Sequence, residues 1–448
     1  MYDETIVRTA NTRIVLKKPE RATLLMRSPP TYRDTPRSDF IKPQSQDFAF
    51  LPRCSIIVAD FPTKEGSLVV KRTLVVILLV VSLLTFAAVK IGFFAPITGP
   101  AAADGASALH GAQLAVEYIN ARGGVLGEPV ELVWYDDNFK ADQAVSIAYK
   151  LVQQDRVAVV VSGSYSGMTR AAAGIYQQLK VPMIAAYAVH PDIVATGEYI
   201  FRVGTLATVQ GRAGAHLAVE KLGAKKIAIL TIDNDFGVSL TAGFKEEAIK
   251  LGAEIVFEQK YPLGETDFRP LLTRIRSARP DVIYATGYFS EAARLVTQAR
   301  QMGIFIPIIG QEGYDSPQFA KLAEAGAANG VVITTDLDRD SEKPIVRWFI
   351  EEYAKRYGLD ADMVAASAFD AVMAAAKAIQ IAGSYDPAKI RDALTTIKAG
   401  DEELEDFVTG FRGFTEKRES LRTVTCQIYL GNRFHWFWEV KDPKIVTP

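Results

Sequence analysis

A serine that follows an apolar strand could bind an anion. The segment SGSYSGMTRAAAG comes after the strand-like run 157–161, and its small residues predict a turn into a helix that opens near Ser166 and Gly167. The serine hydroxyl and the unpaired N–H groups of the first helical turn meet there at the positive end of the helix dipole. This arrangement predicts an anion pocket. A serine in this place is also a common N-cap, and Ser166 could fill both roles.

A carboxylate follows another apolar strand. Glu312 stands in GQEGYDS after the run 306–310, with glycines on both sides. Inside a cleft such a carboxylate needs a cation, and the α-ammonium of an amino acid supplies one through a charge-assisted hydrogen bond. A lone glutamate in a loop is more often solvated surface. Both interpretations remain open on these residues alone.

The remaining residues do not indicate a catalytic site or a cofactor site. The histidines, at positions 110, 190, 216 and 435, are scattered without metal-ligand spacing, and Cys54 and Cys426 cannot form a thiolate zinc site. The glycine-rich stretches lack the GxxxxGK[ST] and GxGxxG patterns. Lys and Arg total 51 against 52 Asp and Glu, so no net field favours nucleic acid. We expect no enzyme, no cofactor, no metal and no nucleic-acid partner.

Strands and helices alternate along most of the chain, which predicts an α/β fold with mostly parallel sheets. Strand-like runs occupy residues 89–97, 130–135, 157–161, 183–188, 227–232, 255–261, 282–287, 306–310 and 331–335. Helical patterns occupy 141–154, 210–222, 239–251, 290–302, 343–357, 364–381 and 387–397. Right-handed crossovers would make doubly wound lobes, and 448 residues suffice for two. Ligands bind beyond the carboxyl ends of such strands, where Ser166 and Glu312 stand.

The front of the chain has a different composition. Residues 71–90 read KRTLVVILLVVSLLTFAAVK, the layout of a secretory signal peptide, which we place at 69–88. An uncleaved membrane anchor is the alternative. Residues 1–66 hold seven of the 21 prolines and no sustained amphipathic period, so we expect a disordered leader. Because a signal peptide does not normally follow such a leader, translation starting near Val69 or Val70 is a further hypothesis.

An ordered series of segments resembles the type I periplasmic binding proteins, and most closely the branched-chain amino acid receptors of ABC transporters. The segments include IGFFAPITGP (91–100), GAQLAVEYINARGGVLGEPVELVWYDD (111–137), KIAILTIDNDFG (226–237) and IIGQEG (308–313). The resemblance covers nearly everything from residue 88 onward. It implies two doubly wound lobes joined by three crossings near 205–210, 334–339 and 422–427. Lobe one would hold 88–205 and 337–424, and lobe two 206–336 and 425–448.

The resemblance also implies roles for residues around an interlobe cleft. Ser166 and the backbone of Tyr187, Ala188 and Val189 would take a ligand carboxylate. Glu312, followed by Gly313, would accept the ligand ammonium. The resemblance also places aromatic rings of lobe two, Phe236 and Tyr288, over the ligand. Tyr165 and Tyr187 add rings from lobe one, so we expect an unusually aromatic cleft.

Three departures from the family pattern concern the ligand's identity. Val189 stands where a hydroxyl is usual, Phe236 where a tyrosine is common, and Asp104 where an aromatic residue often sits. They weaken the case for leucine, isoleucine or valine and allow an aromatic amino acid or another carboxylate. Related receptors often carry a cysteine pair at positions matching Phe139 and Tyr165, and we predict that these rings approach each other instead.

The resemblance therefore implies a periplasmic solute receptor, a monomer, that binds a branched-chain or aromatic amino acid or a related small carboxylate. It would deliver this ligand to an ABC permease in the inner membrane. A membrane-anchored sensor of the same fold is the alternative. A repressor-type regulator would need an N-terminal helix-turn-helix, and the proline-broken residues 1–66 do not fit one.

Overall fold

The computed structural model describes residues 5–9, 12–16, 88–398, 400 and 404–448. Within the predicted leader it describes a two-stranded sheet of β1 (Thr5–Thr9) and β2 (Thr12–Leu16). The predicted signal segment, 69–88, lies outside the described residues except for residue 88, and so does Cys54. The following description concerns residues 88–448, which belong to one compact unit.

Lobe one is built on a five-stranded parallel sheet in the order β4-β3-β5-β6-β7. Its strands are β3 (Val89–Ala95), β4 (Val130–Asp136), β5 (Val159–Ser162), β6 (Met183–Ala185) and β7 (Ile200–Arg202). Its helices are α2 (Ala102–Asn120), α3 (Ala141–Tyr149), α4 (Ser166–Leu179) and α5 (Asp192–Ala195). β5, β6 and β7 are buried along their whole length because helices cover both faces of a parallel sheet.

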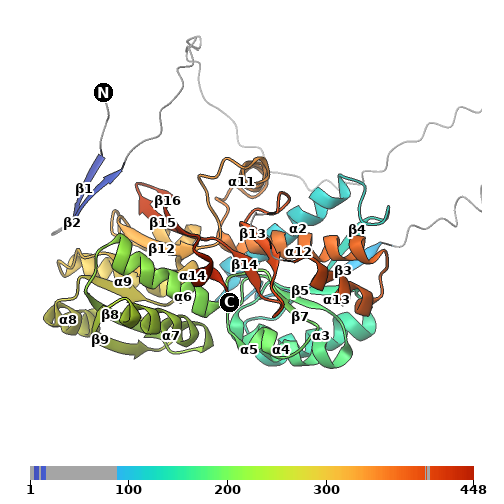
Figure 1. The fold of residues 1–448 in the computed structure, drawn as a ribbon, viewed down its shortest axis with the longest axis horizontal. Coiled ribbons are helices and arrows are strands. Elements are labelled where there is room, and N and C mark those ends of the chain that lie inside the picture. The colour runs from blue at the N-terminus through green and yellow to red at the C-terminus, as the bar shows by residue number, and fades with distance from the viewer. Residues whose placement is uncertain (1–4, 10–11, 17–87, 399, 401–403) are drawn as a thin grey trace, which may run out of the picture. The chain divides into compact units, whose positions relative to one another are not determined.

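Lobe two is built on a seven-stranded sheet in the order β16-β15-β12-β11-β10-β8-β9. The parallel part comprises β8 (Lys226–Ile232), β9 (Glu254–Tyr261), β10 (Val282–Ala285), β11 (Ile308–Gly310) and β12 (Val331–Thr335). The hairpin of β15 (Val424–Leu430) and β16 (Arg433–Val440) adds to β12 antiparallel. The helices are α6 (Ala207–His216), α7 (Asp235–Lys250), α8 (Arg269–Ala278), α9 (Phe289–Gln301), α10 (Pro317–Leu322) and α14 (Pro443–Val446). Figure 1 shows the two sheets side by side.

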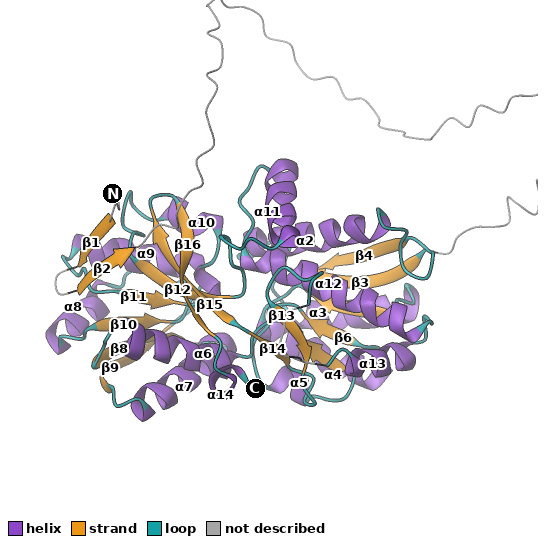
Figure 2. Ribbon diagram, turned by 45° about the horizontal axis from the view of Figure 1, so that its top comes forward, coloured by secondary structure: helices purple, strands orange, loops and turns teal. Residues whose placement is uncertain are grey.

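After β12 the chain returns to lobe one. It forms α11 (Pro344–Tyr357), α12 (Met363–Ala382), α13 (Pro387–Thr396) and a small sheet of β13 (Phe411–Phe414) and β14 (Ser420–Arg422). Figure 2 shows α12 and α13 beside the strands of lobe one, and α11 next to α2. Among the described residues, α12 is the one helix long and apolar enough to cross a membrane, but most of it is buried. Gly111 of α2 lets the two helices approach, since a Cβ there would lie 2.0 Å from the backbone oxygen of Ala365 in α12.

The chain passes between the sheets after β7, after β12 and before β15, and one carboxylate links all three passages. Asp336 accepts hydrogen bonds from the backbone N–H (3.2 Å) and the hydroxyl of Thr205. It also pairs with Arg422 at 2.8 Å, and both side chains are almost fully buried. Arg422 in turn donates to the carbonyl of Val203, 2.9 Å away.

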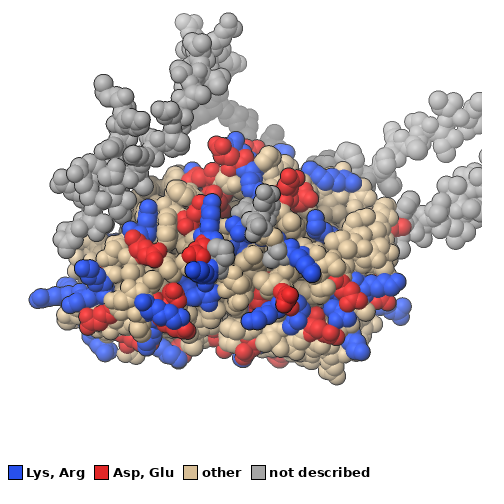
Figure 3. All heavy atoms as spheres, viewed as in Figure 1, with Lys and Arg blue, Asp and Glu red and all other residues tan. Residues whose placement is uncertain are grey.

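The predicted α/β fold with two doubly wound lobes is confirmed. Some boundaries differ from expectation. β15 begins at Val424, which the sequence analysis assigned to lobe one. The helical patterns 141–154 and 210–222 each end in a π-helical turn, Lys150–Gln154 and Leu217–Lys221. Positive and negative side chains are interspersed on the face shown in Figure 3, in keeping with the balanced composition.

Candidate functional site

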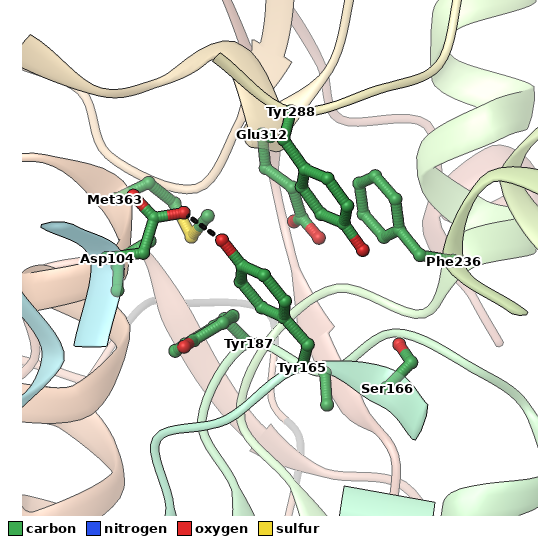
Figure 4. Close-up of a pocket in the computed structure, with 11 residues that line it drawn as sticks. Asp104, Tyr165, Ser166, Tyr187, Phe236, Tyr288, Glu312 and Met363 are labelled. Carbon is green, nitrogen blue, oxygen red and sulfur yellow. Dashed lines mark hydrogen bonds between the residues drawn. The ribbon is translucent and has the colours of Figure 1, made fainter. Parts of the chain in front are cut away.

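A small cavity lies between the lobes, at the carboxyl ends of the strands. Lobe one supplies residues that follow β3, β5 and β6, and the start of α12; lobe two supplies residues that follow β8, β10 and β11. The lining consists of Asp104, Tyr165, Ser166, Tyr187, Ala188, Phe236, Tyr288, Glu312, Gly313, Met363 and Val364. Nearly all the site residues expected from the sequence are therefore brought together (Figure 4). Val189 is the exception: it lies behind the lining, against Ser166.

The predicted anion pocket has a different local geometry from the one expected. Tyr165, not Ser166, is the N-cap of α4, and within the described part of the chain α4 has no side-chain cap. The N-cap interpretation of Ser166 is thus wrong, because the serine is the first helical residue. Its hydroxyl instead accepts a hydrogen bond from the N–H of Val189 at 3.2 Å. That bond joins the start of α4 to the loop that follows β6.

An arginine that sequence reasoning missed holds this loop. Arg202, fully buried on β7, donates to the carbonyls of Ala188 (2.6 Å) and His190 (2.7 Å). Its charge is paired with Glu419 at 2.7 Å. Because Arg202 holds both carbonyls, it restrains the backbone around Ala188, which lines the cavity. No sequence motif marks Arg202, since two of its partners are backbone carbonyls and the third, Glu419, lies far along the chain.

Glu312 lies on the lobe-two side and is 3% exposed. It opens a short 3₁₀ turn, Glu312–Tyr314, directly after β11. Gln210 of α6 donates to its carboxylate at 3.0 Å, and no other hydrogen-bond donor to it is found among the described residues. Burial, together with the carboxylate of Asp336, raises the pKa of Glu312 well above its usual value. A ligand cation would stabilise the ionised form.

Aromatic rings from both lobes stack across the cavity. Tyr165 of lobe one is parallel to Tyr288 of lobe two, with 4.7 Å between centroids, and Tyr288 stacks on Phe236 at 5.1 Å. The hydroxyl of Tyr187 donates to the carbonyl of Gly163 at 2.7 Å. Figure 4 shows the Tyr165, Tyr288 and Phe236 rings in the middle of the site.

The predicted approach of Phe139 and Tyr165 is confirmed. Their centroids are 5.3 Å apart, and the rings are almost perpendicular. This edge-to-face geometry is the one aromatic pairs favour. Phe139 therefore supports Tyr165 from behind, where the related receptors were expected to carry a disulfide.

Asp104 adds a second carboxyl to the cavity. It lies in the first turn of α2, is 4% exposed, and accepts a hydrogen bond from the Tyr165 hydroxyl at Oδ2. Its Oδ1 has no hydrogen-bond partner in the part of the chain that is described. Burial raises the pKa of Asp104 to about 7, against the opposing effect of the Tyr165 bond.

Met363 and Val364 were not expected in the site. They open α12, whose N-cap Asp362 accepts a hydrogen bond from the N–H of Ala365 at 2.8 Å. The sequence pattern predicted this helix from residue 364. It did not predict that the helix begins in the cleft, because the other site residues were found at the ends of strands and no strand leads into α12. Figure 4 shows Met363 beside Asp104.

The free space among these side chains is about 20 Å³, room for about one water molecule. An amino acid therefore enters only if the lobes separate and the Tyr165–Tyr288 stack opens. At the rim the lobes meet through an ion pair between Arg170 of α4 and Asp235 of α7, at 2.7 Å. Both side chains are partly exposed, so this pair contributes about 1 kcal/mol or less to closure.

Comparison with known proteins agrees with this architecture. A family model described as periplasmic binding protein matches residues 88–430. A leucine-, isoleucine-, valine-, threonine- and alanine-binding protein of Pseudomonas aeruginosa is 32% identical over 355 residues, which cover 79% of this chain and 92% of that protein.

Solved structures are similar over the same region. A branched-chain amino acid transporter substrate-binding protein of Streptococcus pneumoniae, in complex with isoleucine, has a TM-score of 0.73 and 30% identity, covering 79% of this chain and 100% of its own. A solute-binding protein of an ABC transporter from Rhodopseudomonas palustris, in complex with 3,4-dihydroxybenzoic acid, has a TM-score of 0.71 at 24% identity, covering 79% and 97%. The second shares the fold.

Proposed function

Because the chain belongs to the periplasmic binding protein family, within its branched-chain amino acid group, we propose that it captures an α-amino acid between its lobes for an ABC importer. Relatives of this group are substrate-binding receptors, and the chain is a receptor of that kind and not an enzyme. The names of the relatives favour an aliphatic amino acid. The departures at Val189, Phe236 and Asp104 favour a different side chain, and an aromatic amino acid or a related carboxylate stays within the proposal.

The observation that carries the proposal is the buried Glu312. Its carboxylate lines the cavity, and Gln210, an uncharged amide, is its hydrogen-bond donor. A buried carboxylate without a charged partner is costly, and a ligand ammonium would offset that cost. The α-carboxylate of the ligand would bind at the start of α4 and the loop at Val189, where backbone N–H groups and the Ser166 hydroxyl lie close together. The two ends of an α-amino acid would thus contact opposite lobes.

Ligand binding would then favour closure. The carboxylate would bind first to lobe one, whose loop is held by Arg202. Glu312, Tyr288 and Phe236 come from lobe two and reach the ligand only when the lobes meet. A ligand stabilises the closed form by as much as these extra contacts are worth, and no more. The passages linked by Asp336 would absorb the rotation.

We place the protein in the periplasm, as the family implies, and propose that the apolar segment 69–88 exports it and that an ABC permease of the inner membrane receives its ligand. Osmotic shock followed by sequencing of the released N-terminus tests the export step. Release of a protein that begins near residue 88 supports cleavage. Retention in the membrane fraction would mean that the segment stays as an anchor, as in a sensor.

A thermal-shift screen tests the ligand class. Aliphatic, aromatic and polar amino acids are compared with their deaminated analogues, each at one concentration. A ligand at about 100 times its Kd stabilises the native state by about 2.7 kcal/mol, a shift that is easily read. Stabilisation by amino acids and not by the analogues supports the proposal. Stabilisation by the analogues alone would show that the site takes a carboxylate without an amine.

A further inference from the structure

We propose that Asp104 recognises a positively charged group on the ligand's side chain, so that the preferred ligand is a basic α-amino acid. The inference rests on the proposed function, because it takes the α-carboxylate and the α-ammonium to be bound as described above. It adds a third point of recognition. Figure 4 shows Ser166 and Asp104 at opposite ends of the labelled group, with Tyr165 between them.

The carboxyl of Asp104 has one oxygen without a hydrogen-bond donor among the described residues. The residue is 96% buried and lines the cavity, and Tyr165 satisfies one of its oxygens. Its Oδ1 has no donor among the described residues. Leaving a buried carboxyl oxygen unpaired is unfavourable, so a donor supplied by the ligand would gain more here than at an exposed site. Tyr165, itself braced by Phe139, holds the carboxyl in position.

The charges of the residues that line the cavity favour a cationic group of the ligand as the donor to Asp104. The described lining of the cavity holds two carboxyls, Asp104 and Glu312, and no Lys, Arg or His. A ligand with one ammonium can neutralise Glu312 only, and its own carboxylate adds a further negative charge. A second cation would let Asp104 ionise with a partner.

The groups packed around Asp104 do not supply that charge. Asp362 and Asp315 both raise its pKa, and the Tyr165 hydroxyl lowers it. Arg339, a cation that acts on neighbouring Asp362, is engaged with Asp315 and with Gln427. The surroundings of the unpaired oxygen are therefore acidic. A neutral donor such as a phenol would not offset the negative charge of these carboxylates.

The rings of the site would favour the same ligand. The faces of Tyr165, Tyr288 and Phe236 are stacked in line. When a ligand parts this stack, its side chain gains ring faces, which attract an ammonium or guanidinium through their quadrupole. The methylene stem of such a side chain would pack on Met363 and Val364, the apolar part of the lining.

Isothermal titration of the whole protein with L-lysine and L-norleucine tests the inference. The two ligands have stems of similar length and differ in the terminal ammonium, so their ratio of affinities reports on that group. We expect lysine, or L-arginine in its place, to bind about 10- to 100-fold more tightly than norleucine, as for a buried charge-assisted hydrogen bond. In Asp104→Asn this preference should fall to about threefold or less. Asp142→Asn, which removes an exposed carboxylate of α3, should keep it.

Two results would overturn the inference: norleucine binding as tightly as lysine to the wild type, or a preference for lysine that Asp104→Asn leaves unchanged. Circular dichroism of the variant checks that it folds. Titration with 6-aminohexanoate, which has the carboxylate and the terminal amine but no α-amine, separates this inference from the proposed function. If it binds as well as lysine, the α-amine role of Glu312 is wrong while that of Asp104 stands.

Discussion

The ion pair between Asp336 and Arg422 should be the most sensitive point of the hinge. The two side chains are 2.8 Å apart, and their exposed fractions are 0% and 1%. Asp336→Asn keeps the shape but leaves the guanidinium buried without its counter-charge. Removing one partner of a buried pair costs about 3–5 kcal/mol. The free energy of unfolding of a typical protein is about 5–15 kcal/mol, so this loss is a large part of it.

Urea unfolding of the ligand-free protein, followed by circular dichroism, measures this loss as a lower midpoint at an unchanged slope. Asp340→Asn is the matched control, because Asp340 pairs with Arg433 at 2.7 Å while both side chains are about a third or more exposed. It should cost about 1 kcal/mol or less. Adding Arg422→Met to Asp336→Asn removes the unpaired charge and should restore part of the stability. A loss for Asp336→Asn no larger than the control's would refute the reasoning.

Three further outcomes are expected. Gly111→Ala should destabilise the fold by about 1–3 kcal/mol in the same assay, because its Cβ would meet the Ala365 carbonyl at 2.0 Å; a neutral effect would mean that the helices can move apart. Arg202→Lys should weaken amino acid binding about tenfold by calorimetry, since a lysine cannot hold the Ala188 carbonyl with the same planar fork; unchanged affinity would contradict that role. The pKa of Asp104 is raised to about 7, and a basic ligand binds its ionised form, so the ratio of lysine affinity to norleucine affinity should hold above pH 7 and fall by about tenfold per pH unit below it; both ligands share the pH dependence of Glu312, which cancels in the ratio, and a flat ratio would argue against the pairing.

The sequence indicated the fold and the location of the site for physical reasons that can be named. Strand ends in parallel sheets converge, so residues that follow separate apolar runs, such as Ser166 and Glu312, could be expected near one another. The loss of both halves of a cysteine pair suggested that Phe139 and Tyr165 meet, and they do.

The features that escaped prediction depend on tertiary contacts. Met363 reaches the cavity from a helix that returns late in the chain, and Arg202 acts through backbone carbonyls that any residue provides. The stack of Tyr165 on Tyr288 depends on how the two lobes face each other, which local patterns do not encode. The role expected of Ser166 as an N-cap was wrong by one residue, since helix starts are the least regular part of a pattern.

The central claim is that Glu312 binds the α-amine of the ligand. Calorimetric titration of wild type and Glu312→Gln with the best amino acid from the screen tests it most directly. Glu291→Gln is the control, because Glu291 is another buried carboxyl of lobe two that does not line this cavity in the described structure. We predict a loss of affinity of about 10- to 100-fold for Glu312→Gln and little change for the control. Equal affinity of Glu312→Gln and wild type would contradict the account.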